Sequence, residues 1–415
     1  MNQLFIYDTI PHINKTRNKM KFTKLSLVAA LAISAAFAGG DIEPVAAPVA
    51  EYPQTSIDGK LTGYYITSDD GKPAYDMFDK DWSQLGLAVT LDVSHKFTEN
   101  IAMNFSALGY VNTNKDIPFG YMSNGYFEGQ DNGAFINVAN ITATFMDTTF
   151  ILGRQLLNTP MLTGFDWLLA PGSFEAYTFA NSSIENVTFI GSYVRTWRIN
   201  NTGDNWNNLT SDALGGGDNW TLSAAYDNKT ISGSIWYYNI DAGAAVGPDK
   251  YDQIYVDGAY DFSVAKISAQ YVNTNYDTDN IDDSNVFGIK GTATLGAFSL
   301  MAAYVSVSDN VASWIGVMDG LYTSSWNSAT GGSMGNNFKV EAGTEFSGLT
   351  ASVSYAYYEY EQNENAGLKD DGQEIDVILG YDITDTIDAN LAYTNTDYGL
   401  GEDTNALEIY ANYKF

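Results

Sequence analysis

Large apolar residues occupy every second position in stretch after stretch of this chain, from residue 85 to the last residue. Residues 85–93 read LGLAVTLDV, and residues 407–415 read LEIYANYKF. Because successive side chains of a strand point to opposite faces, this alternation predicts strands with one apolar and one polar face. No segment after residue 38 approaches 18 consecutive apolar residues, so membrane-spanning helices are not expected. The alternation alone fits both a soluble β-sandwich and a β-barrel in a membrane.

Three further features favour the barrel. Short connections, such as 146–148 and 296–298, alternate with long polar ones, such as 112–133 and 308–336, as they do in outer-membrane barrels. Aromatic residues gather near the strand ends, where the girdles at the two membrane interfaces would lie. The final strand ends in Phe415, the kind of terminal aromatic residue that serves as an outer-membrane assembly signal.

We therefore predict an all-β fold, a transmembrane antiparallel β-barrel that occupies residues 54–415. Counting the alternating segments gives about 18 strands, and residues 174–198 are the hardest part to divide. Sixteen strands also fit the pattern. Either number leaves a lumen wide enough for water, whereas a barrel of eight strands would be filled by its own side chains.

The first 38 residues predict a secretory signal peptide. Two lysines precede an apolar run, 25–38, which ends in the small-x-small pattern Ala36-Phe37-Ala38. This run is shorter than the roughly 20 residues that span a bilayer as a helix; a buried helix or a membrane anchor is the alternative. The signal begins at Met20, which is a second candidate for the translation start. Residues 39–53 are rich in Pro, Ala and Glu and predict a short linker.

The charge and composition exclude several functional classes. Twenty Lys and Arg against fifty Asp and Glu give a formal net charge of −30, which disfavours nucleic-acid binding. There is no Cys and there are only two His, so disulfides, thiolate catalysis and Cys- or His-rich metal sites are excluded. The acidic run Asp277–Asp283 lacks the Gly and the distant Glu of an EF-hand, so a solvated outer loop is preferred to a Ca²⁺ site. We expect no metal and no cofactor.

The segment 151–177 is the most specific in the chain. It reads ILGRQLLNTPML at 151–162 and DWLLAPGSFEA at 166–176. This resembles the third strand pair of OprD-type porins (the Opr family), where a Gly-rich strand end runs into a Thr-Pro loop that continues with Asp-x-x-Leu-Leu-Pro and Phe-Glu-Gly. The residues in comparable places are Asp166, Leu168, Leu169, Pro171, Phe174 and Glu175. The sequence departs from the family pattern at Ala170 and Ala176, and it lacks the Arg usual inside the loop.

The signal and the opening Gly39-Gly40-Asp41 also resemble the major outer-membrane porins of campylobacter-type bacteria. The resemblances imply an 18-stranded homotrimeric porin in the outer membrane of a Gram-negative cell. Such a protein contacts outer-membrane lipid and lipopolysaccharide and is inserted by the barrel assembly machinery. The resemblance further implies that the third outer loop, Leu156–Gly172, folds inward as a constriction.

Charged residues near that loop are the candidate constriction residues. The only Arg residues after the signal are Arg154, Arg195 and Arg198, and all three flank the loop. They either form a basic patch on the pore wall or pin the loop through its carbonyls, and the sequence leaves both roles open. Asp166 and Glu175 are the acids expected to line the opposite side, with turn capping as the alternative.

A second set of charges falls on the polar faces of the predicted strands. A charge facing lipid at mid-depth costs about 2–4 kcal/mol, so these residues should face the lumen. The predicted pore-lining residues are Asp92, Lys290, Lys339, Glu341, Glu408 and Lys414.

The sequence thus predicts a porin for passive diffusion of small hydrophilic solutes and ions, with a mild preference for cations. The alternative is an exported, acidic, β-rich surface-layer or adhesin protein, which would need neither alternating loop lengths nor a terminal Phe. An enzyme is not expected, because a Ser–His hydrolase in a barrel needs a His near the outer rim and His95 lies beside a short turn.

Overall fold

The computed structural model describes residues 52–69, 76–113, 132–164, 169–198, 202–211, 215–243, 250–277, 281–316, 320–327, 334–359, 371–397 and 403–415. The predicted signal peptide (1–38) and almost all of the predicted linker (39–53) lie outside these ranges. Among the residues that are described, no helix is long and apolar enough to cross a membrane.

The described chain is built of strands. Eighteen of them form the wall of a barrel: β1 (Gln54–Ser68), β2 (Ser83–Lys96), β3 (Ile101–Asn112), β4 (Gly133–Phe145), β5 (Thr148–Gln155), β7 (Ser173–Ile184), β8 (Val187–Arg198), β10 (Trp220–Asp227), β11 (Ile231–Asp241), β12 (Lys250–Asp261), β13 (Ala265–Tyr276), β14 (Ser284–Leu295), β15 (Phe298–Ser308), β17 (Gly335–Phe346), β18 (Leu349–Glu359), β19 (Asp371–Asp382), β20 (Ile387–Asp397) and β21 (Thr404–Lys414). Three short strands lie beside the wall or inside it: β6 (Leu162–Thr163), β9 (Trp206–Asn208) and β16 (Ile315–Gly316).

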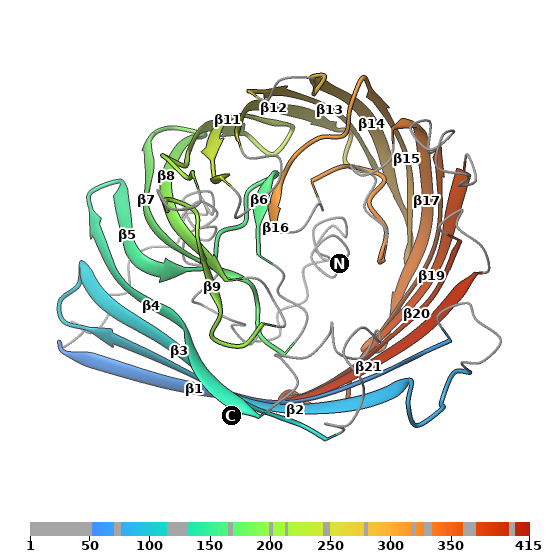
Figure 1. Ribbon diagram of the computed structural model, residues 1–415, viewed down its shortest axis with the longest axis horizontal. Helices are drawn as coiled ribbons and strands as arrows, with labels where there is room; N and C mark the ends of the chain where they lie inside the picture. The colour runs from blue at the N-terminus through green and yellow to red at the C-terminus, as the bar shows by residue number, and fades with distance from the viewer. Residues whose placement is uncertain are drawn as a thin grey trace.

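Each wall strand pairs antiparallel with its neighbours in chain order, and β21 returns to pair with β1. The sheet is therefore closed, and its strands surround a central space that holds β6 and β16 (Figure 1). The predicted all-β barrel of 18 strands is confirmed, and the alternative of sixteen is not realised. Residues 174–198, the segment hardest to divide from sequence, form the pair β7 and β8.

The two ends of the barrel differ in their connections. At one end the strands are joined by turns of two to four residues, and Asn186 and Gly296 adopt positive φ angles in two of these turns. At the other end, the outer end, nine connections of six to 26 residues join the strands. We number these connections L1 to L9 in chain order, so that L3 is 156–172, L4 is 199–219 and L7 is 309–334. The predicted alternation of short and long connections is present throughout.

The alternation of side chains gives the wall two chemically different faces. Leu87 and Val89 on β2 are 47% and 43% exposed and lie on the outside, whereas Ala88 between them is buried on the inside. The same pattern repeats around the barrel and leaves a band of large apolar side chains on the outer face. An apolar outer band suits contact with the hydrocarbon of a bilayer, where no water can solvate a polar side chain.

Tyrosines near the outer end of the barrel form part of the aromatic girdle that the sequence predicted. Several donate their hydroxyl to a polar side chain on the next wall strand, for example Tyr237 to Asp252 (2.8 Å) and Tyr393 to Asn405 (2.7 Å). An aromatic ring with a polar tip is favoured at the boundary between hydrocarbon and water. These pairs mark the level of the wall at which the membrane meets water on the side of the long loops.

Candidate functional site

Loop L3 leaves the outer end of β5 and enters the barrel. Met161 and Leu162 are almost completely buried against Trp236 and Tyr238, which lie on the inner face of β11. The backbone N–H of Met161 donates to the hydroxyl of Tyr238 (3.3 Å). The third outer loop is therefore folded inward, as the resemblance implied. Its predicted acid Asp166 lies outside the described residues.

A second loop, L7, also lies inside the barrel, and the alternating pattern of the sequence did not predict it. Its residues Ile315 and Gly316 form β16, which pairs in parallel with Leu162 and Thr163 of L3 (Figure 1). The two inward loops are thus joined by backbone pairing in the central space. The sequence did contain a signal for this inward position, because residues 311–318 of L7 read VASWIGVM, an apolar run in a connection that was expected to be polar.

Polar side chains on the inner face of the wall hold L7 in place. Gln253 on β12 donates to the carbonyl of Ser313 (2.9 Å). Gln270 on β13 donates to the carbonyl of Gly320 (2.9 Å) and accepts from the N–H of Tyr322 (2.9 Å). Further along, Lys339 on β17 donates to a carbonyl of the same loop. L7 therefore follows the inside of the wall across successive strands and does not hang freely in the lumen.

Arg198 is at the base of L3 but does not face the water of the lumen, because its side chain is 0% exposed. Its Nε donates to Oδ1 of Asn137 on β4 (2.8 Å), and its two terminal nitrogens donate to the carbonyls of Pro171 (2.8 Å) and Gly203 (3.1 Å). Its guanidinium stacks on the ring of Phe135 at 4.4 Å. Of the two roles left open by the sequence, this geometry is that of a pin between L3, L4 and the wall.

Glu175 and Arg195 are brought together, but away from the constriction where we expected them. Glu175 shares its face of β7 with Tyr177 and Phe179, which are 45% and 38% exposed on the outside of the barrel. Its neighbours Phe174 and Ala176 are completely buried on the inside. Arg195 pairs with Glu175 (3.4 Å) at a bulge between the two strands.

The correction has a simple physical cause. Phe174 packs against L3, and this fixes the register of β7 so that the next side chain must point outward. Arg154 is opposite Glu175 on β5 and has the parity of the exposed Leu152. Its guanidinium donates to the carbonyl of Ile136 (3.0 Å) and lies 4.2 Å from the ring centre of Trp206. Arg154 therefore makes its contacts on the outer face of the wall and not in the constriction.

All six predicted pore-lining residues have the parity of the inner face. Asp92 lies opposite Asp58 on β1, and Lys414 pairs with Asp388 of β20. Lys339 and Glu408 are only 5% and 1% exposed, since L7 covers them. Of the six predicted residues, Asp92, Lys290, Glu341 and Lys414 remain partly exposed on the inner face.

Beside L7 the inner wall carries a patch of positive and negative side chains. Lys290 lies 4.3 Å from the ring centre of Tyr322, a loop residue. Burial raises the pKa of Tyr322 well above its usual range, so this hydroxyl stays neutral. Lys266 and Asp257, on the two preceding strands, are within electrostatic range of Lys290. The lumen thus presents both signs of charge at the level of L7.

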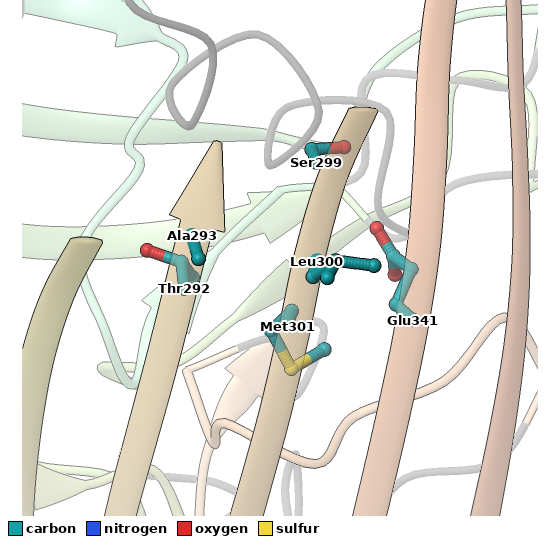
Figure 2. Close-up of a pocket in the computed structure, with 6 residues that line it drawn as sticks. All are labelled: Thr292, Ala293, Ser299, Leu300, Met301 and Glu341. Atoms are coloured by element: carbon teal, nitrogen blue, oxygen red, sulfur yellow. The ribbon is translucent and has the colours of Figure 1, made fainter. Parts of the chain in front are cut away.

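A hollow in the same wall lies among β14, β15 and β17, and its lining includes Thr292, Met301 and Glu341 (Figure 2). Leu300 and Ala293, which also line it, have outer-face parity. The hollow is therefore a gap between side chains of the sheet. Within the described residues no three Asp, Glu or His side chains gather in the manner of a metal site.

The fold matches that of solved outer-membrane porins. OpdK of Pseudomonas aeruginosa, crystallised with vanillate, superposes with a TM-score of 0.72 at 14% identity, over 87% of this chain and 98% of that chain. A BenF-like porin of Pseudomonas fluorescens Pf-5 gives 0.71 at 14% identity, over 87% and 99%. OccK3 (OpdO) of P. aeruginosa gives 0.68 at 15% identity, over 87% and 95%.

No protein-family model and no curated protein matches the sequence. At 14–15% identity, the structural likeness shows the fold and leaves the function to be argued from the chain itself. The neighbours are channels and not enzymes, and they are proteins of Gram-negative outer membranes.

Proposed function

We propose that this protein is an outer-membrane channel for passive diffusion of small hydrophilic solutes and ions. The observation that carries the proposal is the closed 18-strand wall, apolar outside and polar inside, with two loops folded into its centre. A wall of this size surrounds an aqueous lumen, and loops inside it restrict that lumen without sealing it. The shared fold with solved porins supports the same function.

The mechanism requires no cofactor and no chemical step. A solute enters among the outer loops, passes the level at which L3 and L7 meet, and leaves past the short turns. Its size relative to the remaining cross-section decides whether it passes, and the charges on the inner wall bias its passage. Arg198, Tyr238 and Gln270 contribute by fixing the two loops, because each bonds a loop backbone atom.

A mild preference for cations is part of the proposal. The chain has a formal net charge of −30, and Asp92 and Glu341 face the lumen. Lys290 and Lys414 oppose them, and Lys414 is already paired with Asp388. Acids at the outer mouth raise the local cation concentration mainly in dilute salt, since the Debye length is about 8 Å at physiological ionic strength. The preference should therefore weaken as salt rises.

Location in the outer membrane and assembly into an oligomer are further parts of the proposal. An apolar outer band with tyrosines at its edge supports insertion among outer-membrane lipid and lipopolysaccharide. We further propose that the signal peptide 1–38 directs export of the chain. The barrel assembly machinery then recognises Phe415 and inserts the barrel, which assembles into a homotrimer. A surface-layer or adhesin protein would have no use for an apolar outer band.

A second candidate function is uptake of small carboxylates. Lys290, Lys266 and the ring of Tyr322 lie close together on the lumen side, an arrangement that suits an aromatic acid. OpdK, one of the structural neighbours, was crystallised with vanillate. If this function holds, vanillate should reduce the ion current through single channels, whereas vanillyl alcohol, its uncharged counterpart, should not.

Liposome swelling tests the diffusion proposal. Vesicles that contain the purified barrel should swell in isotonic solutions of small neutral sugars, and the rate should fall steeply with sugar size. Vesicles that contain heat-denatured protein are the control. Absence of swelling with the smallest sugar would contradict the proposal.

A further inference from the structure

Three buried carboxylates lie on the inner wall against Trp326 and Asn327 of loop L7. Glu374 and Asp376 are on β19 and Glu408 is on β21, and their exposed fractions are 0%, 2% and 1%. Keeping a carboxylate away from water at such burial is costly unless donors bond to its oxygens. The donors here include groups of L7.

Trp326 supplies two of those donors. Its indole Nε1–H donates to Oε1 of Glu408 (2.8 Å), and its backbone N–H points at Oδ2 of Asp376 (3.4 Å). The other oxygen of Glu408 accepts from the hydroxyl of Tyr64 (2.7 Å). The next residue, Asn327, donates its N–H to Oε1 of Glu374 (2.7 Å).

The indole ring also fills an apolar site on the wall. Trp326 is 2% exposed and belongs to a buried cluster with Tyr64, Ile66, Ala392 and Tyr410. These residues come from β1, β20 and β21, so the ring packs across the seam at which the barrel closes. One tryptophan therefore combines apolar burial with bonds to charged acceptors.

The residues before Trp326 are fastened to the neighbouring strands. Lys339 on β17 donates to the carbonyl of Ser324 (2.8 Å), and the hydroxyls of Ser325 and Tyr358 on β18 are bonded to each other. Residues 324–327, which we call the latch, thus contact five successive wall strands from β17 to β21.

We propose that Trp326 is a positioning residue of the channel, and that its seat on Glu408, Asp376 and the seam holds L7 against the wall and keeps the lumen open. The latch has two self-consistent arrangements. In one the ring covers the carboxylates and donates to them, and in the other water hydrates them and the loop projects into the lumen. A half-withdrawn ring leaves Oε1 of Glu408 without its indole donor and still shielded from water, so intermediate positions are disfavoured. The inference rests on the proposed diffusion function.

Single-channel recording combined with thiol labelling tests the latch. Trp326→Ala should add a second, lower conductance level that interrupts the main level, whereas the wild type should hold one level. Trp314→Ala is the matched control, because it removes the same side chain from the same loop but not from the latch. Glu408→Gln retains the volume of the acceptor, removes its charge, and should give the lower level less often than Trp326→Ala.

Because the chain contains no Cys, Ser325→Cys is a unique reporter beside Trp326. Ser325 is 1% exposed, so a water-soluble maleimide should label Ser325→Cys slowly. In Ser325→Cys/Trp326→Ala the rate should rise at least about tenfold, the factor that corresponds to 1.4 kcal/mol in favour of the open latch. A heat-modifiable gel band confirms that each variant is a folded barrel. If Trp326→Ala does not fold, the conductance recording and the maleimide labelling are made on Glu408→Gln instead.

The outcomes separate the latch from the function on which it rests. A wild-type barrel that gives no conductance step overturns the diffusion proposal. A conducting wild type whose Trp326→Ala and Glu408→Gln variants keep one level and leave Ser325→Cys protected overturns the latch. A lower level that appears equally in Trp314→Ala also overturns it, because the effect would then belong to the loop as a whole.

Discussion

The ring of Phe415 lies over Gly59, and the backbones of the two residues exchange hydrogen bonds of 2.8 and 2.9 Å. A Cβ at position 59 would stand 2.3 Å from the ring. Gly59 is on β1 and Phe415 follows β21, so this contact sits at the closing seam of the barrel. An aromatic ring that covers a cross-strand glycine is a known way of fixing strand register. The last residue therefore helps to close the sheet.

Gly59→Ala should weaken closure by displacing that ring. We expect a loss of about 1 kcal/mol, at the upper end of the range for one cross-strand pair. Gly63→Ala is the matched control on the same strand, since its Cβ would meet only Leu87, at an ordinary 3.6 Å. The midpoint temperature of the heat-modifiable gel shift measures the difference, and equal midpoints for the two variants would contradict the proposed role.

Deleting Phe415, or replacing it with Asp, should lower the amount of folded barrel in the outer membrane and leave unfolded chain in the periplasm. Two effects combine, since the proposed assembly signal and the cover of Gly59 are lost together. Cell fractionation followed by unheated gels measures the folded amount. Wild-type levels of folded barrel in both variants would show that the final residue is dispensable.

Arg198→Ala should destabilise the barrel far more than Arg195→Ala. Loss of Arg198 removes three buried, charge-assisted hydrogen bonds at once, to the carbonyls of Pro171 and Gly203 and to Oδ1 of Asn137, a cost on the order of 3 kcal/mol. Arg195 pairs with Glu175 at a 45% exposed position, where such a bond contributes less than about 1 kcal/mol. Urea unfolding in detergent compares them. A similar loss for both variants would contradict the pinning role of Arg198.

Lys290→Gln should strengthen the preference for cations, because it removes a positive charge from the lumen face beside L7. We expect the permeability ratio of K⁺ to Cl⁻ to rise about twofold in dilute salt and to change little in concentrated salt, where the charge is screened. Lys229→Gln serves as the control, because it removes an equal charge from an exposed short turn at the end of the barrel opposite the long loops. An unchanged ratio in Lys290→Gln would remove Lys290 from the ion path.

The wall of the barrel could be predicted from the sequence because it depends on local patterns. The alternation around Leu87 and Val89 reports one apolar and one polar face directly, and loop lengths report which end is which. The inner positions of Lys290 and Glu341 follow from the same parity. These features need no knowledge of distant contacts.

The interior could not be predicted in the same way. The outward position of Glu175 depends on Phe174 packing against L3, and the seat of Trp326 depends on Glu408, which is 82 residues further along the chain. Neither relationship leaves a periodic trace in the sequence. The expected set of charges around L3 was therefore only partly right: Arg198 lies beside the loop as a buried pin, while Glu175 and Arg195 meet at the outer face.

Planar-bilayer recording of the purified wild-type protein across a KCl gradient tests the central claim most directly. A water-filled lumen narrowed by L3 and L7 predicts discrete, ohmic conductance steps. It also predicts a reversal potential that is displaced towards K⁺ and approaches zero as both salt concentrations rise. An absence of steps, or a firm preference for Cl⁻ in dilute salt, would contradict the account.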